Sequence, residues 1–525
     1  MSSAFPPPAA VALDSPSSDA GSLQVKDVYI SSEKVAQDAH EGVIDRDRRA
    51  EKRALLKVDL VVIPLVGMYY LLSFIDRSNI GNARIAGLQK TLNMSNTQFS
   101  TALTITYVPY ILMELPMNLL MKRLGANNTL PIMVALWGMV CACQGAVKTY
   151  GGLLACRFFL GALEGGLFPG IVLYMSTFYK RHEMQLRFSM MFSATSLAGA
   201  FSGLLAAGIE NMDGVRGLSG WAWIFILEGV FTTLFGLITF FLRIPSSPNQ
   251  ISPLILTPHE RSTYCAALGE DWSADADVDG EEPEVFSWKE VGSVFTLKEG
   301  LHVWLICVPL FFSGVTLFGL ANFTPTIVNA LGYGTTHTQL LTVPPYACSF
   351  VLSIVCSYLC DKYKQRGAMA VGTSLLAAVG YAIFLGSKNK HADYAALFLQ
   401  IIGVYAGAPC LSTWNSNNVQ PHYRRATAIA CAFAATNIGG IVSTWIFIDP
   451  PRFHTATSIN LAFSLAMAAF CAIIMIYLDH VNERKKREIE RLEKEGDIHG
   501  GESGWDSRRE RRRLGDRHPR FVYTL

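Results

Sequence analysis

The sequence predicts an all-α polytopic membrane protein with twelve transmembrane helices in two six-helix bundles. Only 16% of the 525 residues are charged and the mean hydropathy is +0.28, whereas a typical soluble chain carries about 25% charged residues. The charges gather near the N-terminus, in a central stretch and in the C-terminal tail, and long apolar runs separate them. This pattern excludes a soluble enzyme, a disordered chain and a secreted disulfide scaffold.

Each apolar run is long enough to cross a bilayer, since a spanning helix needs about 20 such residues. The first six are expected at 57–78, 98–121, 129–147, 152–177, 187–209 and 221–243. The second six are expected at 301–329, 338–360, 368–386, 392–414, 426–448 and 457–479. The predicted domains are a largely disordered tail over 1–56, bundles over 57–243 and 301–479, a linker over 244–300 and a tail over 480–525.

Basic residues predict the orientation, because loops rich in Lys and Arg stay on the cytosolic side. The segment before the first run is rich in them: Arg46, Arg48, Arg49, Lys52, Arg53 and Lys57. Loops at alternate ends of the runs continue the pattern, for example Arg424 with Arg425, and the intervening loops are poorer in basic residues. We therefore expect both termini and the linker in the cytosol, with the plasma membrane as the location.

Short motifs outside the apolar runs predict local features. Thr257-Pro258-His259-Glu260 predicts a helix that begins with a capping box and has proline at its first position. Ser287-Trp288-Lys289-Glu290 predicts a second helix of this kind, and the acidic strip from Glu270 to Glu284 predicts a solvated loop. Asn93-Met94-Ser95 is a glycosylation sequon in an outer loop, so Asn93 is a candidate glycosylated residue.

Four charges inside the apolar runs are the main functional candidates, because ionisable residues are expensive within a membrane. Asp76 and Arg77 lie in the first run, and Arg157 and Glu164 lie on one face of the fourth, seven residues apart. Facing the bundle centre, the four could form a nearly neutral cluster. A guanidinium can hold a carboxylate through two hydrogen bonds, and a buried carboxyl group can take up a proton. The alternative is a static salt-bridge network that stabilises helix packing.

Other polar groups in the runs are weaker candidates. Glu114 lies in the second run, and Glu228 lies near the outer end of the sixth, where a solvated role is an equal expectation. Tyr110, Asn437 and Trp414 could complete a cavity, with helix packing as the alternative. Phosphate-loop, metal-ligand and nucleophile motifs are absent from the sequence. A net charge of +2 indicates no nucleic-acid partner. We expect no cofactor, no metal and no enzymatic activity.

Several motifs resemble the major facilitator superfamily. Residues 361–367, Asp-Lys-Tyr-Lys-Gln-Arg-Gly, resemble its cytosolic gate motif, and residues 157–161, Arg-Phe-Phe-Leu-Gly, resemble the motif linked to proton coupling. Residues 72–83 and 414–418 are similar to the anion:cation symporter branch, and within it to the fungal allantoate and nicotinate permeases. The resemblance covers roughly residues 45–525.

This resemblance implies a fungal permease that takes up an organic anion with protons. It implies proton coupling by Asp76 and Glu164, carboxylate binding by Arg77 and Arg157, a cavity lined by Tyr110 and Asn437, and gating by Asp361, Arg366 and Gly367. We therefore expect a monomer in the lipid bilayer that performs symport of a small monocarboxylate, such as nicotinate, allantoate or a related vitamin or ureide. The alternatives are an exporter of an acidic secondary metabolite and a nutrient receptor that does not translocate its ligand.

Overall fold

The protein is described from a computed structural model. The described residues are 21–180, 183–209, 212–276, 288–296, 299–420, 422–447, 453–494, 510–511 and 514–525. Every regular element in these residues is an α-helix or a short 3-10 helix, which confirms the predicted all-helical class. The chain divides into two compact units. One contains the residues up to Lys57 with Ser252–Ala267, and the other contains Val58–Ile251 with Leu268–Leu525.

The described residues of the first half of the chain contain eight α-helices. They are α1 Gly21–Ile85, α2 Leu88–Thr91, α3 Asn96–Leu124, α4 Ala126–Gln144, α5 Tyr150–Glu164, α6 Leu167–Ser176, α7 Met184–Ile209 and α8 Gly220–Phe241. The predicted run 152–177 is divided between α5 and α6 at Gly165 and Gly166. At this break the backbones come close together, because a Cβ on Gly165 would lie 2.4 Å from the carbonyl oxygen of Tyr110.

Another eight α-helices lie in the part of the second half that the structure describes. They are α9 Pro258–Ala276, α10 Trp288–Val294, α11 Leu301–Ala330, α12 Thr335–Tyr363, α13 Arg366–Gly386, α14 Lys390–Asn417, α15 His422–Ile446 and α16 His454–Lys494. The acidic strip predicted as a loop is helical where it begins, because α9 continues to Ala276. The rest of the strip, and Ser287 of the second predicted capping motif, lie outside the described residues.

The N-terminus of α9 has the predicted capping box. The Glu260 N–H donates to Thr257 Oγ1 at 3.3 Å, and the Thr257 N–H donates back to Glu260 Oε2 at 3.0 Å. Lys57 Nζ donates to the same carboxylate oxygen at 2.7 Å. The Lys57 ammonium, together with the hydrogen bonds from Thr257, holds the pKa of Glu260 below its ordinary value.

Eleven helices in the described part of the chain are long and apolar enough to cross a membrane. They correspond to eleven of the twelve predicted runs. The remaining run, 98–121, is helical within α3, which has 29 residues but is not among the eleven. This helix carries Glu114 and two internal prolines, Pro109 and Pro116.

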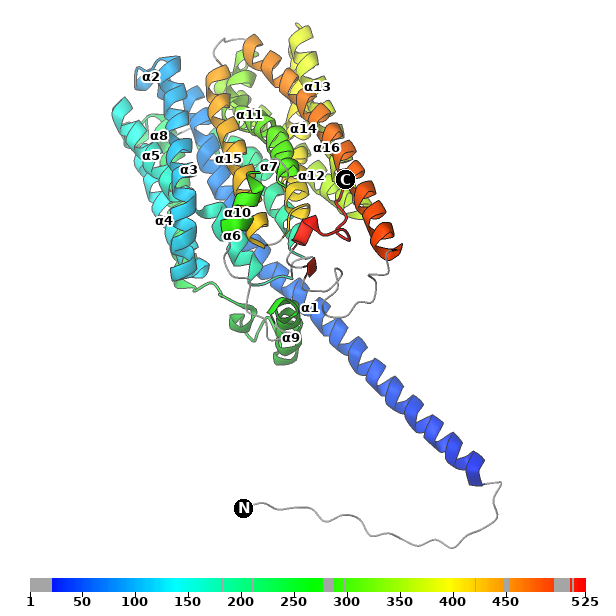
Figure 1. The fold of residues 1–525 in the computed structure, drawn as a ribbon. Coiled ribbons are helices and arrows are strands. Elements are labelled where there is room, and N and C mark those ends of the chain that lie inside the picture. Colours follow the sequence, from blue (N-terminus) through cyan, green and yellow to red (C-terminus); the bar gives the residue numbers. More distant parts are fainter. Residues whose placement is uncertain are drawn as a thin grey trace. The chain divides into compact units, whose positions relative to one another are not determined.

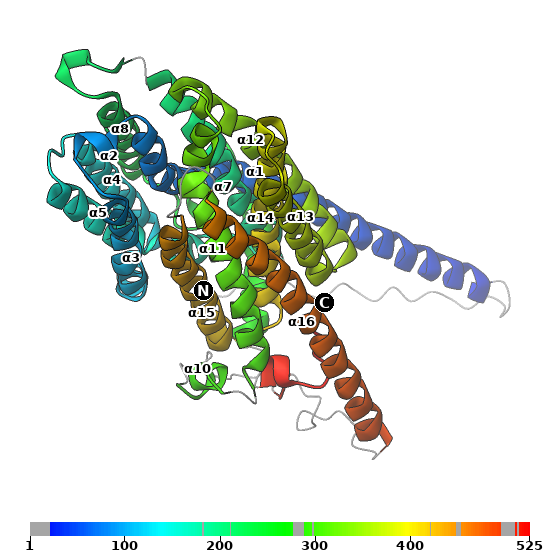
Figure 2. The ribbon, with the colours of Figure 1, turned by 90° about the horizontal axis from the view of Figure 1, so that it is seen from above.

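Within the larger unit, the long helices form two groups. Figure 1 shows α3, α4, α5 and α8 on one side and α13, α14 and α16 on the other, and Figure 2 shows the same division from above. In the first group α4 packs on α8 and α3 on α5, and in the second α13 packs on α14 and α16. Contacts of α7 with α12 and of α3 with α15 join the groups. Side chains on these contacting faces are shielded from lipid.

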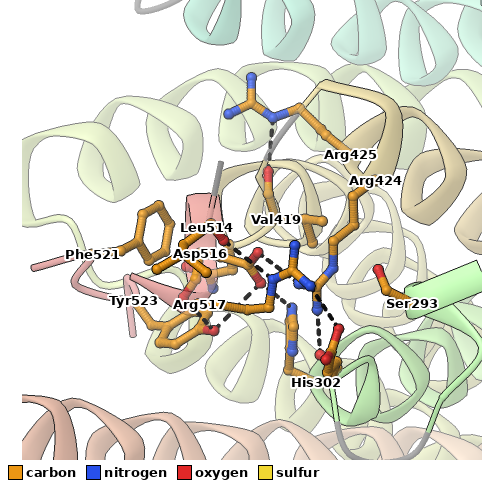
Figure 3. A network of polar contacts seen from close by, with 12 residues as sticks. Ser293, His302, Val419, Arg424, Arg425, Leu514, Asp516, Arg517, Phe521 and Tyr523 are labelled. Carbon is orange, nitrogen blue, oxygen red and sulfur yellow. Dashed lines mark hydrogen bonds and ion pairs between the residues drawn. The ribbon is translucent and has the colours of Figure 1, made fainter. Parts of the chain in front are cut away.

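The C-terminal segment 514–525 packs against the second group of helices (Figure 3). Asp516 is fully buried. Its carboxylate accepts a hydrogen bond from Arg424 Nη1 at 3.0 Å and lies 3.2 Å from His302 Nε2. The next residue, Arg517, is paired with Glu290 at 2.7 Å and with Glu299. The segment therefore connects α10, α11 and α15.

Candidate functional site

A cavity of about 400 Å³ lies between the two groups of helices. The side chains that line it come from α1, α3, α6 and α7 in the first half of the chain and from α11, α14 and α15 in the second half. Much of the wall is aromatic: Tyr70, Phe74, Tyr110, Phe188, Phe192, Phe318 and Phe433. Cavities of this size hold small organic molecules, and aromatic walls suit a flat or apolar body.

Arg77 brings a positive charge to this aromatic wall. Its guanidinium lies 4.4 Å from the ring centre of Tyr110 and 5.7 Å from that of Phe74. Its Nε donates to Glu164 Oε2 at 3.0 Å, and the Arg77 side chain is only 12% exposed. A guanidinium has five N–H donors, of which one bonds to Glu164 and another to the Tyr110 hydroxyl. Arg77 can therefore hold a second carboxylate that enters the cavity.

Glu164 stands behind Arg77 and is not part of the cavity wall. It is fully buried at the C-terminal end of α5. Its second oxygen, Oε1, has no hydrogen-bond partner in the part of the chain that the structure describes. The pair with Arg77 thus supplies the charge compensation of this carboxylate, and a bound anion would compete for the same guanidinium.

Asp76 precedes Arg77 on α1 but faces α4. Successive helical residues diverge by about 100°, so the carboxylate of Asp76 is turned away from the cavity. It accepts hydrogen bonds from Trp137 Nε1 at 2.9 Å and from Cys141 Sγ at 3.2 Å, and Asp76 is fully buried. The proton-coupling candidates Asp76 and Glu164 therefore lie in different surroundings.

Arg157 is also buried, at 1% exposure. Its guanidinium lies 5.6 Å from the ring centre of Phe225, and Nε and Nη2 have no partner among the described residues. It borders a small cavity of about 20 Å³ together with Arg77 and Tyr110. Across the described residues the structure joins Arg77 to Glu164, and it records no ion pair for Asp76 or for Arg157. Asp76 and Arg157 interact electrostatically with each other and with Glu164, without an ion pair at contact distance.

Glu228 is a buried acid, although its place near the end of its apolar run also allowed a solvated role. It lies in α8, is only 5% exposed, and neither carboxyl oxygen has a partner within the described ranges. The signal that could have identified it is the glycine that follows. A Cβ on Gly229 would lie 2.2 Å from the backbone nitrogen of Ala142, so α8 meets α4 closely at this point and buries the acid.

The other predicted cavity residues divide into two groups. Tyr110 and Asn437 line the cavity, and the Asn437 amide donates to the Phe433 carbonyl at 3.0 Å. Trp414 is fully buried in the apolar core of the second group, where its Nε1 donates to the Thr524 carbonyl at 2.8 Å. The structure therefore places Trp414 against the C-terminal segment, while its neighbour Thr413 lines the cavity.

The predicted gate and glycosylation residues lie apart from the cavity. Arg366 Nη2 donates to Asp361 Oδ1 at 2.7 Å, and the Arg366 N–H donates to the Leu525 carbonyl at 2.7 Å. A Cβ on Gly367 would lie 2.5 Å from the Met475 side chain, so α13 meets α16 closely here. Asn93 is exposed and has a positive φ of 49°. Gating and glycosylation stay predictions.

Solved structures share this architecture. A proton:xylose symporter superposes with a TM-score of 0.61 at 14% identity, over 80% of this chain and 95% of that one. A bacterial homologue of the human lysosomal transporter Spinster, in an inward-facing and occupied conformation, gives 0.59 at 14% identity, over 79% and 96%. Both likenesses concern the fold alone.

Sequence relatives cover most of the chain. An uncharacterized transporter of Schizosaccharomyces pombe is 34% identical over 84% of this chain and 86% of its own length. A high-affinity nicotinic acid transporter of Saccharomyces cerevisiae is 32% identical over 92% and 86%. The family model of the Major Facilitator Superfamily matches residues 66–444. The chain therefore belongs to the major facilitator superfamily and is a multi-pass membrane transporter, not an enzyme.

Proposed function

We propose that this transporter takes up a small organic monocarboxylate together with protons. The observation that carries the proposal is Arg77, a buried guanidinium on the wall of an aromatic cavity of about 400 Å³. An aromatic acid would place its ring among Phe74, Tyr110 and Phe318 and its carboxylate on Arg77. The name of one relative, the nicotinic acid transporter, points to such a substrate.

Charge balance supplies the coupling in this proposal. Arg77 is neutralised by Glu164 while the cavity is empty of substrate. A substrate carboxylate that binds the same guanidinium would leave two buried carboxylates sharing one positive charge, which is strongly unfavourable. Protonation of Glu164 removes this penalty. The anion is therefore expected to bind together with a proton, and both would be released when the halves of the transporter rock about the cavity.

The distribution of basic loops predicts the orientation of the transporter, and the plasma membrane is part of the proposal. If these loops are cytosolic, both termini lie inside the cell, and a symporter in the plasma membrane would use the inward proton gradient for uptake. Transport by a monomer is part of the proposal, because the cavity is formed by one chain.

The test is uptake of labelled nicotinate into proteoliposomes with an imposed proton gradient. Accumulation that an uncoupler abolishes would support the proposal. Nicotinamide, which has the same ring but no carboxylate, is the matched control and should not accumulate, while allantoate tests an aliphatic carboxylate. The proposal would be overturned if a full panel of monocarboxylates gave no accumulation, or if accumulation were insensitive to the uncoupler. Efflux only, in vesicles of defined orientation, would favour the exporter.

A further inference from the structure

Glu228 is a buried acid that the proposed Arg77–Glu164 exchange does not use. It lies within α8 and neither of its oxygens has a hydrogen-bond partner in the described residues. An ionised carboxylate in this situation would cost far more than a neutral one, because it has lost water and gained no donor. In this conformation Glu228 is therefore a neutral acid that carries a proton.

Two ionisable groups, Asp76 and Cys141, interact electrostatically with Glu228, and a third, Arg157, interacts with both of them. Asp76 lies on α1, and Cys141 on α4 is in electrostatic range of both carboxyl groups. Arg157 on α5 reaches α8 through Phe225, one turn before Glu228. The cluster thus contains two acids, one thiol and one guanidinium, at a position behind the substrate cavity.

The hydrogen bonds distinguish the two acids of this cluster. Asp76 accepts two hydrogen bonds, from Trp137 and Cys141, which favours its ionised form. Glu228 accepts none, which favours its protonated form. With one guanidinium, one carboxylate and one neutral acid, the cluster has no net charge. Such a balance is what burial in a membrane protein requires.

Arg157 gives the cluster a second arrangement. Its Nε and Nη2 are buried and have no partner among the residues described here. If a movement of α5 against α8 brought these donors onto Glu228, the carboxylate form would be stabilised and the proton would leave. The proton on Glu228 can therefore be released by a rearrangement of α5 and α8.

We propose that Glu228 carries a second proton in each transport cycle, so that two protons accompany each monocarboxylate. This inference rests on the proposed proton-coupled uptake, in which the Arg77–Glu164 pair accounts for one proton and makes transport electroneutral. The second proton makes each cycle carry one net positive charge. Asp76 and Arg77 are neighbours on α1, so the second proton site and the anion site share one turn of helix.

The experiment measures how nicotinate accumulation in proteoliposomes depends on membrane potential. Wild-type transport should be accelerated by an inside-negative potassium diffusion potential. For one pH unit of gradient at zero potential, one proton supports about tenfold accumulation and two protons about 100-fold. Glu228→Gln should lower the maximal nicotinate accumulation from about 100-fold to about tenfold. It should also abolish the acceleration by the membrane potential. Glu228→Asp, which keeps an acid, should retain both.

Thr232→Val is the matched control. Thr232 lies one turn further along α8, is fully buried and has no partner for its hydroxyl among the described residues. The substitution should leave the stoichiometry unchanged. If wild-type transport is coupled to protons but does not respond to the membrane potential, the proposed role of Glu228 is overturned and the proposed symport still holds. This wild-type measurement tests the proposal even if Glu228→Gln does not fold. Wild-type transport that does not depend on a proton gradient at all would overturn both proposals.

Discussion

Two adjacent residues of α1, Asp76 and Arg77, point in different directions and have different partners. Arg77 joins the cavity wall, whereas Asp76 faces α4 and is held by Trp137 and Cys141. Arg77 is paired with Glu164, whereas Asp76 accepts hydrogen bonds from neutral donors and interacts electrostatically with Arg157. Because both are attached to the same turn of helix, a small rotation of α1 would alter the anion site and the proton site together.

Arg77→Lys tests the anion site. Lysine keeps the charge but loses the planar pair of donors and the stacking on Tyr110. A hydrogen bond to a charged group contributes about 1.5–3 kcal/mol, so KM for nicotinate should rise roughly tenfold or more. The measurement is initial uptake over a range of nicotinate concentrations.

The control for this substitution is Arg84→Lys on the same helix. The Arg84 guanidinium lies 4.4 Å from the ring centre of Phe99, in a comparable aromatic contact, but Arg84 does not line the cavity. Its substitution should leave KM unchanged. Equal effects of the two substitutions would contradict a specific role for Arg77.

At the scale of elements, the structure uses short segments to hold helix ends. The capping box of α9 satisfies backbone donors that a helix start leaves without partners. The C-terminal segment buries Asp516 between α11 and α15 and places Arg517 on two acids (Figure 3). Both segments are polar, yet each has specific partners. Sequence composition alone would have assigned them to solvated tails and linkers.

The stability of the first turn of α9, where the capping box lies, should depend on pH. The pKa of Glu260 is lowered from its ordinary 4.5, mainly by Lys57. The stabilisation that the ionised Glu260 carboxylate gives to the helix start is therefore complete above pH 4.5. It is lost as the pH falls through the lowered value. Hydrogen exchange at the amides of Glu260 and Arg261 should therefore be slow at neutral pH and, after correction for intrinsic rates, faster in acid.

Glu260→Gln should remove this dependence on pH, because glutamine does not titrate. Ser262→Ala, in the same turn, is the control. The Ser262 hydroxyl donates to the His259 carbonyl and takes no part in the capping box. Identical pH profiles for the wild type and Glu260→Gln would show that the ionised carboxylate is not what stabilises this turn.

Asp516→Asn tests the C-terminal segment. It leaves the fully buried Arg424 without its charged partner. Removing one member of a buried pair typically costs about 3–5 kcal/mol. Arg517→Gln is the comparison, because the Arg517 side chain is 23% exposed, and an ion pair that keeps contact with water contributes less than a fully buried one. Thermal unfolding of the purified protein should show a clearly larger decrease in Tm for Asp516→Asn, and a Tm equal to that of Arg517→Gln would contradict the assignment.

At the scale of the whole molecule, the two groups of helices meet through hydroxyl groups and small residues. The hydroxyls of Thr104 on α3 and Thr444 on α15 are 2.7 Å apart, and Trp445 Nε1 donates to Thr104 Oγ1 at 3.0 Å. A Cβ on Gly199 of α7 would lie 2.6 Å from the ring of Tyr346 on α12. Rocking of the two groups would have to break such contacts in every cycle.

A crosslink between α3 and α15 should therefore stop transport. In the Thr104→Cys/Thr444→Cys double variant, a short thiol-specific crosslinker should join the groups in the present conformation. Nicotinate uptake should cease and should return after reduction. Each single variant treated with the same reagent is the control, and it also accounts for the eleven native free cysteines. Full transport by the crosslinked double variant would show that this contact does not open.

The sequence by itself determined the membrane class, the helical runs, the buried charges and the family resemblance. These depend on local properties: the length of each apolar run and the rarity of charge within it. Tertiary structure decided which charges meet. It paired Arg77 with Glu164, turned Asp76 toward α4, buried Glu228 and placed Trp414 against the C-terminal segment. The physical reason is that partners depend on how each helix is rotated and how closely it approaches its neighbours, and neither is encoded within a single run.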